Sequence, residues 1–242
     1  MNSAKATVKV RPPPKPEDYR VAIIAPLEIE SIAAIQLLDE KHEGRFPVTR
    51  GSGYVYTLGE MCGHNVIIAT LPAGHEYGVG SAAALASQIL SNFPDLWFGL
   101  LVGVAAGMPN LQCDDPRDIR LGDVLVALPM GENPGLINLD LGKWNSNGFE
   151  LRRHGWMDKT YKLVLSAISQ VKAEDYVQDE PSFLKHYEAM MKNGKCRKIF
   201  SKPRQESDGS YQADGSEGST PSVWYGTIGS GSSVIKSASR RE

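Results

Sequence analysis

The sequence predicts an α/β fold, because segments typical of buried strands alternate with segments typical of helices. Residues 21–25 (VAIIA) form a short continuous apolar run, as expected of a strand covered on both faces. Residues 28–39 follow with apolar positions spaced for one buried helix face. Residues 78–92 are rich in alanine and stop before Pro94, which is typical of a helix end. The chain has 242 residues and 41% hydrophobic content, enough for one buried core.

The remaining elements continue this alternation along the chain. A glycine in the segment MCG favours a hairpin between two strands there. The further strands are predicted at residues 54–60, 64–71, 98–104, 124–128 and 223–228, and two amphipathic helices at residues 161–172 and 181–191. In a sheet of this kind, ligands bind where the strands end.

Two segments have compositions unlike a packed domain. Residues 1–18 contain a run of prolines, and residues 201–222 are rich in Ser, Gly, Asp, Glu and Gln. Such segments bury too little apolar surface to offset the loss of chain entropy on folding. We therefore predict a disordered leader at 1–18, one domain at 19–242, and a disordered insertion at 201–222 within it.

Charge and cysteine content narrow the range of functions. The formal net charge of −2 gives no electrostatic reason to expect nucleic acid or an anionic membrane as a partner. The three cysteines are too scattered for a metal or redox motif, and no apolar run reaches membrane-spanning length. We expect a cytoplasmic protein without a metal site or a cofactor.

Three loops at predicted strand ends contain unusual residues. The loop at 25–30 places Glu28 and Glu30 in the opening turn of a helix, where acids also simply complement the helix dipole. The loop at 71–80 is a glycine-punctuated turn before a helix, a type that binds anions in some proteins and nothing in most. The loop at 102–109 is no dinucleotide fingerprint, because Pro109 and the polar run after it leave no helix for a pyrophosphate.

Together these segments resemble the purine and uridine phosphorylase superfamily. The order VAIIAPLEIE, residues 71–80, FGLLVGVAAGMP, DIRLGDVLVALP and GTIGSGSSVIK is similar to that superfamily over residues 19–242. The nearest subgroup is the nucleoside phosphorylase-like or methylthioadenosine/S-adenosylhomocysteine nucleosidase-like domain of fungal multidomain, NLR-like proteins. The resemblance implies a three-layer α/β/α sandwich with a mixed central sheet, here lacking the last strand and helices.

The resemblance also implies roles for individual residues. Glu30 matches the acid that orients and deprotonates the attacking water in the nucleosidase branch, and Glu28 is then a capping or solvated acid. The substrate-binding positions implied are Ala25 and Pro26 after the first strand, Tyr77 beside the ribose, the backbone of Val104, Ala105 and Ala106 along ribose and base, and Ser232, Val234 and Ile235 at the purine ring. Serine at 232 departs from the Asp or Asn usual there.

Two departures from the superfamily affect the predicted chemistry. The phosphorylases hold phosphate with arginines after the first strand and before the glycine of the central strand, and this chain has none there. Hydrolysis is therefore favoured over phosphorolysis, and Arg117 and Arg120 are predicted to be solvated charges. The chain also ends before the acids that grip ribose and protonate the purine, so we expect impaired turnover and self-association.

Two functions of different classes follow from these residues. The first is an enzyme that cleaves the N-glycosidic bond of a purine nucleoside or nucleotide without a metal, through Glu30. The second is a catalytically weak or inactive domain that binds a nucleoside and signals within an immunity-like multidomain protein. In both cases the expected partner is a small-molecule nucleoside or nucleotide, with further copies of the chain as a second partner.

Overall fold

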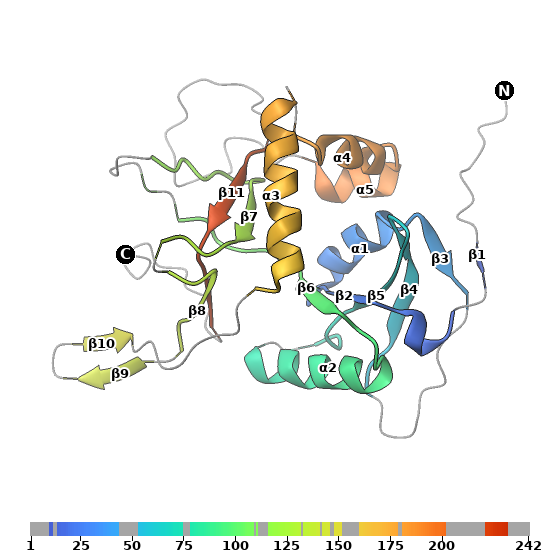
Figure 1. Ribbon diagram of the computed structural model, residues 1–242, viewed down its shortest axis with the longest axis horizontal. Helices are drawn as coiled ribbons and strands as arrows, with labels where there is room; N and C mark the ends of the chain where they lie inside the picture. Colours follow the sequence, from blue (N-terminus) through green and yellow to red (C-terminus); the bar gives the residue numbers. More distant parts are fainter. Residues whose placement is uncertain are drawn as a thin grey trace. The chain divides into compact units, whose positions relative to one another are not determined.

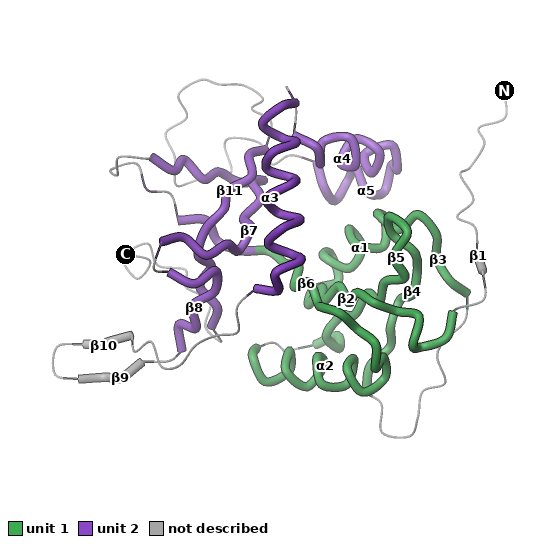
Figure 2. Tube along the Cα trace, viewed as in Figure 1, with its two compact units in different colours: residues 1–104 green, residues 105–242 purple. Residues whose placement is uncertain are grey.

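A computed structural model describes the chain at residues 10–11, 14–43, 53–74, 78–108, 110, 116–131, 133–140, 142–145, 148–151, 160–178, 181–201 and 221–231 (Figure 1). The chain divides into two compact units, residues 1–104 and residues 105–242 (Figure 2). Each unit is described by itself below. The single domain predicted for residues 19–242 stays a prediction.

Unit 1 is built on a mixed six-stranded sheet with the order β1-β3-β4-β5-β2-β6. Its strands are β1 (Val10–Arg11), β2 (Val21–Ile24), β3 (Glu40–His42), β4 (Tyr56–Met61), β5 (His64–Ala69) and β6 (Phe98–Leu101). The strand β2 pairs in parallel with both β5 and β6, whereas β4 is antiparallel to β3 and to β5. The apolar run that forms β2 thus lies inside the sheet, as its lack of alternation predicts.

Helices cover both faces of this sheet, α1 (Glu28–Gln36) on one and α2 (Val79–Asn92) on the other (Figure 1). Ala22 of β2 belongs to the buried cluster that holds Leu85 and Ile89 of α2. The next residue, Ile23, packs instead with Ala34 of α1. Successive residues of a strand point to opposite faces, so unit 1 is a three-layer α/β/α arrangement, as the family resemblance implied.

The predicted hairpin joins β4 and β5. Met61 pairs with His64, so the loop holds only two residues, and Cys62 and Gly63 have φ values of 50° and 77°. Two successive residues with positive φ are what a tight hairpin turn requires, because they match the twist of its strands. Asp39 Oδ2 accepts a hydrogen bond from the Cys62 N–H at 2.6 Å and secures the turn.

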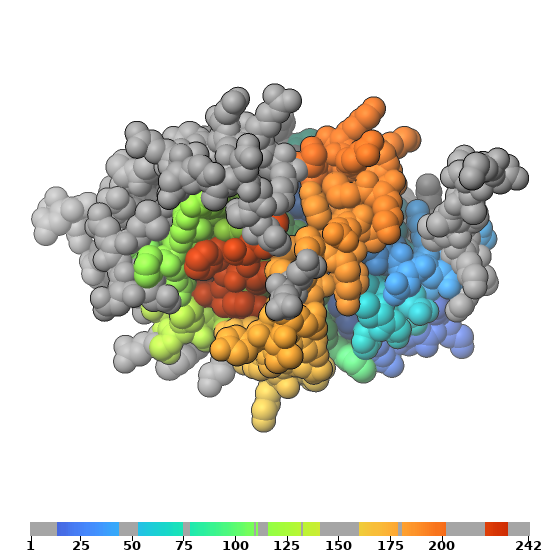
Figure 3. Space-filling view, turned by 90° about the horizontal axis from the view of Figure 1, so that it is seen from above, coloured from blue at the N-terminus to red at the C-terminus, as the bar shows by residue number. Residues whose placement is uncertain are grey.

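The described residues of unit 2 form pairs of short strands and three helices. The strands are β7 (Val124–Ala127), β8 (Leu136–Asn138), β9 (Gly142–Asn145), β10 (Gly148–Leu151), β11 (Val223–Gly226) and β12 (Ile228–Ser230). The strand β11 pairs in parallel with β7, β12 pairs in parallel with β8, and β9 and β10 are antiparallel. The helices are α3 (Lys162–Val177), α4 (Leu184–Met191) and α5 (Gly194–Phe200). In Figure 3 the atoms of β11 and β12 lie against those of the segment that contains β7 and β8.

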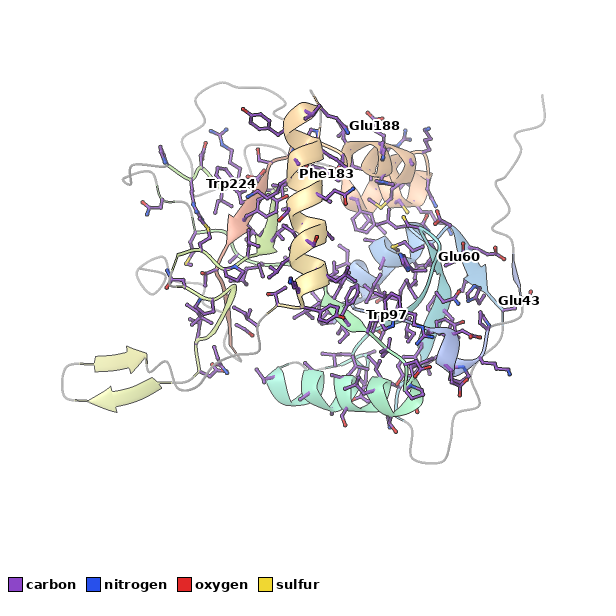
Figure 4. The ribbon with its side chains drawn as sticks, viewed as in Figure 1. Glu43, Glu60, Trp97, Phe183, Glu188 and Trp224 are labelled. Carbon is purple, nitrogen blue, oxygen red and sulfur yellow. The ribbon has the colours of Figure 1, made fainter. Side chains whose placement is uncertain are left out.

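Asp123 holds the start of the β7–β11 pair together. Its Oδ2 accepts hydrogen bonds from the indole Nε1–H of Trp224 at 2.8 Å and from the backbone N–H of Arg120 at 2.9 Å, and its Oδ1 accepts one from the Ser222 N–H (Figure 4). A carboxylate with several donors in one place fixes their relative positions. The DIRLGDV motif therefore joins two segments that lie about a hundred residues apart in the sequence.

Several predicted boundaries need correction. The helix α1 ends at Gln36 rather than at residue 39, β6 ends at Leu101 rather than at residue 104, and α3 continues to Val177. Inside the predicted leader the structure has β1 and a short 3-10 helix, Pro16–Asp18. Most of the predicted leader and insertion lies outside the described residues. Among the described helices, none is long and apolar enough to cross a membrane.

Candidate functional site

The candidate site of unit 1 lies where two neighbouring parallel strands end. Ile24 of β2 pairs with Leu101 of β6, and the N–H of Val102 donates to the Ile24 carbonyl at 2.9 Å. The loop at 25–27 and the segment at 102–104 therefore leave the sheet side by side, at the carboxyl ends where α/β proteins bind ligands.

Glu30 connects these two segments. It is the third residue of α1 and only 8% exposed. Its Oε2 accepts a hydrogen bond from the Leu27 N–H at 2.7 Å, and its Oε1 accepts one from the Val104 N–H, also at 2.7 Å. The first bond caps a helix donor that no carbonyl can reach. The second bond crosses from the helix to the end of β6, so one carboxylate organises both loops.

This arrangement determines what Glu30 can do chemically. An ionised carboxylate offers about four lone-pair directions, and the two described hydrogen bonds use one on each oxygen. Each oxygen retains a direction for a further donor, such as a water O–H. The fixed side chain is suited to orienting a small donor, because its rotamer is held before any ligand arrives. Glu28 is exposed, as predicted for a solvated acid.

The other predicted binding residues differ in their exposure and in the unit to which they belong. Ala25 is fully buried, so its side chain has no surface for a ligand, and Pro26 is half-buried. Val104 is 78% exposed, but its N–H already donates to Glu30. Ala105 and Ala106 are exposed and belong to unit 2. Tyr77, Ser232, Val234 and Ile235 lie outside the described residues.

The two arginines predicted to be solvated are half-buried and engaged within unit 2. Arg117 donates to the Tyr225 carbonyl at 3.4 Å and contacts the sulfur of Met130 at 3.3 Å. Arg120 pairs with Asp118, with Nε donating to Oδ2 at 2.8 Å. The two charges predicted to be solvated are thus partly exposed, and each also has a partner within unit 2. In the described part of the chain, no group of three or more His, Cys, Asp and Glu side chains could hold a metal ion.

Gly103 is a residue of this site that the sequence did not reveal. A Cβ added to it would lie 3.1 Å from Glu30 Oε1. The sequence signal was a glycine directly after a predicted buried strand, and such a glycine marks a close approach of another group to the backbone. The identity of that group depends on the pairing of β2 with β6, which brings α1 to this position.

Comparison with sequence relatives gives one informative match. No protein-family model matches the chain. A "nucleotide-binding leucine-rich repeat (NLR)-like protein" of the fungus Hyaloscypha variabilis is 34% identical over 258 aligned residues, which cover all of this chain. The chain spans about a quarter of the length of that relative, 25%. It is therefore similar to one segment of a longer protein.

Solved structures identify the fold. The 5'-methylthioadenosine/S-adenosyl homocysteine nucleosidase of Helicobacter pylori superposes with a TM-score of 0.51 at 12% identity, covering 93% of this chain and 69% of that one. The chain has the nucleosidase fold. A protein assigned to the same nucleosidase class from Borrelia burgdorferi B31, bound to adenine, gives a TM-score of 0.50 at 12% identity, covering 89% of this chain and 67% of that one. The predicted α/β class with a mixed sheet is confirmed. Within this fold, Glu30 lies at the carboxyl ends of β2 and β6.

Proposed function

We propose that this chain cleaves the N-glycosidic bond of a purine nucleoside or nucleotide, with water rather than phosphate as the acceptor. One observation carries the proposal: the Glu30 carboxylate is buried and fixed at the carboxyl ends of two parallel strands. The nucleosidase fold and the adenine bound to the Borrelia burgdorferi protein support a purine as the leaving group.

In the proposed reaction, Glu30 orients a water molecule toward the anomeric carbon of the sugar. The bond between that carbon and the purine nitrogen breaks, the sugar becomes oxocarbenium-like, and the water oxygen forms the new bond. Glu30 accepts a proton from the water, and the purine takes up one proton as it leaves, so the products are free base and free sugar. Positioning of the water beforehand removes much of the entropic cost of this step.

Water is the favoured acceptor because the described segments that follow β2 and β6, residues 25–30 and 102–108, contain no arginine. Phosphate recognition in proteins relies strongly on bidentate arginine. In unit 1 Arg20 precedes β2, at the other end of that strand, and its guanidinium lies 3.4 Å from the Asp95 carboxylate and 5.7 Å from the centroid of the Trp97 ring (Figure 4). In unit 2 Arg117 and Arg120 are engaged as described above.

A second function, nucleoside binding without turnover in a signalling protein, is favoured by the NLR-like relative. That relative is about four times longer than this chain, because the chain covers 25% of it. A module of such a protein needs to distinguish bound from free ligand, and rapid cleavage is not required for that. Under this alternative, Glu30 orders the loops of a binding site.

The test is release of purine base from adenosine, inosine or AMP, followed by chromatography. We expect Glu30→Gln to lower the rate by about 10²–10⁴-fold, the usual contribution of a general base. The matched control is Glu28→Gln, two residues earlier in the same helical turn and exposed, which should keep the rate within about twofold. Wild-type turnover in Glu30→Gln would exclude the proposed role.

Omitting inorganic phosphate tests the acceptor in the same assay. Free sugar should form at the same rate with and without phosphate, and no sugar 1-phosphate should accumulate. A strict requirement for phosphate would overturn the hydrolase assignment. Calorimetric binding of a nucleoside without any release of base would instead support the signalling alternative.

A further inference from the structure

Gly103 leaves room for the carboxylate on which the proposed function depends. It lies two residues beyond the end of β6 and directly before Val104, whose N–H binds Glu30 Oε1. A Cβ at position 103 would be 3.1 Å from Glu30 Oε1, 3.5 Å from Cδ and 3.7 Å from Oε2. All three nearest atoms are therefore those of one carboxylate group.

We propose that Gly103 is the positioning residue of the site, because the absence of its side chain lets Glu30 approach the backbone and bind the Val104 N–H. The inference rests on the proposed function for its catalytic consequence, but its geometric part stands without it. Conformational freedom is not the reason for glycine here, because the φ angle of Gly103 is not positive. The requirement is for space.

The carboxylate has little freedom to move away from a new methyl group. Glu30 is 8% exposed, and both of its oxygens accept hydrogen bonds at 2.7 Å. A Cβ–oxygen distance of 3.1 Å needs a few tenths of an ångström of relief. If the carboxylate retreats, Oε1 leaves the Val104 N–H; if the segment at 102–104 retreats, that N–H leaves Oε1. Both responses lengthen the same hydrogen bond.

Gly99, inside β6, provides a matched control. A Cβ at Gly99 would meet its nearest neighbour, the Ala22 carbonyl oxygen, at 3.8 Å, which is ordinary van der Waals contact. Gly99→Ala thus makes the same chemical change four residues earlier without touching Glu30. Any effect specific to Gly103→Ala then reports on the carboxylate.

The first experiment measures amide hydrogen exchange at Leu27 and Val104 in the 242-residue chain, and it needs no turnover. Glu30→Ala should speed exchange at both amides, because both donate to that side chain. Gly103→Ala should speed exchange at Val104 by about tenfold, the effect of losing one net hydrogen bond. Gly99→Ala should leave both amides unchanged. Unaltered exchange at Val104 in Gly103→Ala would overturn the proposal.

The second experiment is a double-mutant cycle in the base-release assay. Gly103→Ala should lower kcat by about tenfold or more with a smaller change in KM, and the same substitution in a Glu30→Gln background should have no further effect. Equal losses of kcat in both backgrounds would show that Gly103 does not act through Glu30. If the wild-type chain releases no base, the proposed function fails, and the exchange experiment alone decides the role of Gly103.

Discussion

Tyr19 is a fully buried tyrosine whose environment determines its protonation. Its hydroxyl lies 2.8 Å from Nδ1 of His42, and its ring packs edge-on against Phe93, with 5.6 Å between centroids. Burial raises the pKa of Tyr19 well above its usual value, and the carboxylate of Asp18 adds to the rise. The hydroxyl therefore keeps its proton well into the alkaline range and shares a hydrogen bond with His42 Nδ1, whose direction is set by the imidazole tautomer.

This raised pKa predicts how stability depends on alkaline pH. An unfolded tyrosine loses its proton near pH 10, whereas the folded Tyr19 keeps it. The contribution of Tyr19 to the free energy of unfolding is therefore fully present below about pH 10 and falls above it, by up to about 1.4 kcal/mol per pH unit. Tyr19→Phe should remove this component. Urea unfolding of both proteins between about pH 8 and pH 11 should show the wild-type advantage shrinking as pH rises; a constant difference would contradict the assignment.

The role of Glu30 could be predicted from the sequence only in part. Its place in the first turn of a helix after a buried strand is visible in the local pattern. Its bond to the Val104 N–H joins residues 74 positions apart and depends on the parallel pairing of β2 with β6. Because these residues are far apart in the sequence, the Val104 backbone was expected to bind a ligand. In the structure its N–H already donates to Glu30.

At the scale of elements, the strands with a longer apolar run were predicted, whereas several short ones were missed, among them the polar strand β3. The strand β3 reads Glu-Lys-His, yet Glu40 and His42 are buried, and the strand pairs with β1 and β4. Its conformation comes from tertiary pairing, because its residues have no strong strand propensity. The helix α1 was predicted to end too late, because the pairing of β3 in the sheet requires the chain to leave the helix after Gln36.

The contact between β4 and the segment before β3 makes Gly59 a sensitive position. A Cβ there would lie 2.5 Å from the Glu40 carbonyl oxygen and 2.8 Å from a methyl carbon of Leu38. Gly59→Ala should therefore lower the free energy of unfolding by about 1–3 kcal/mol, the usual effect of overpacking. Gly80→Ala in α2 has nothing within 4 Å and should raise it by about 0.4–1 kcal/mol. Thermal unfolding of both variants checks the opposite signs; equal shifts would contradict the packing argument.

At the scale of the whole chain, the two units differ in how much of their described surface is buried. Among the described residues nearly all the buried ones belong to unit 1, and in the described part of unit 2 only Gly135 and Cys196 are buried. In α3 no described residue is buried, and Tyr176 and Val177 near its end are 93% and 84% exposed. Apolar side chains so exposed favour contacts with other molecules.

We therefore expect the 242-residue chain to self-associate. Light scattering should give a mass above that of one chain at about 100 µM, a concentration at which exposed apolar surface drives association. Tyr176→Ser combined with Val177→Ser should lower the measured mass, because it removes the two most exposed apolar side chains of α3. Lys185→Ser on the exposed side of α4 is the control and should not lower it. A single monodisperse species of one-chain mass in the wild type would refute this expectation.

The double attachment of Glu30 also has a mechanical consequence. The carboxylate ties the first turn of α1 to the residue that follows Gly103 through two bonds of 2.7 Å. Any displacement of the segment at 102–104 must either break the bond at Val104 or pull on the opening turn of α1. The opening turn of α1 and the segment after β6 therefore move together. A ligand that displaces one of them also displaces the other.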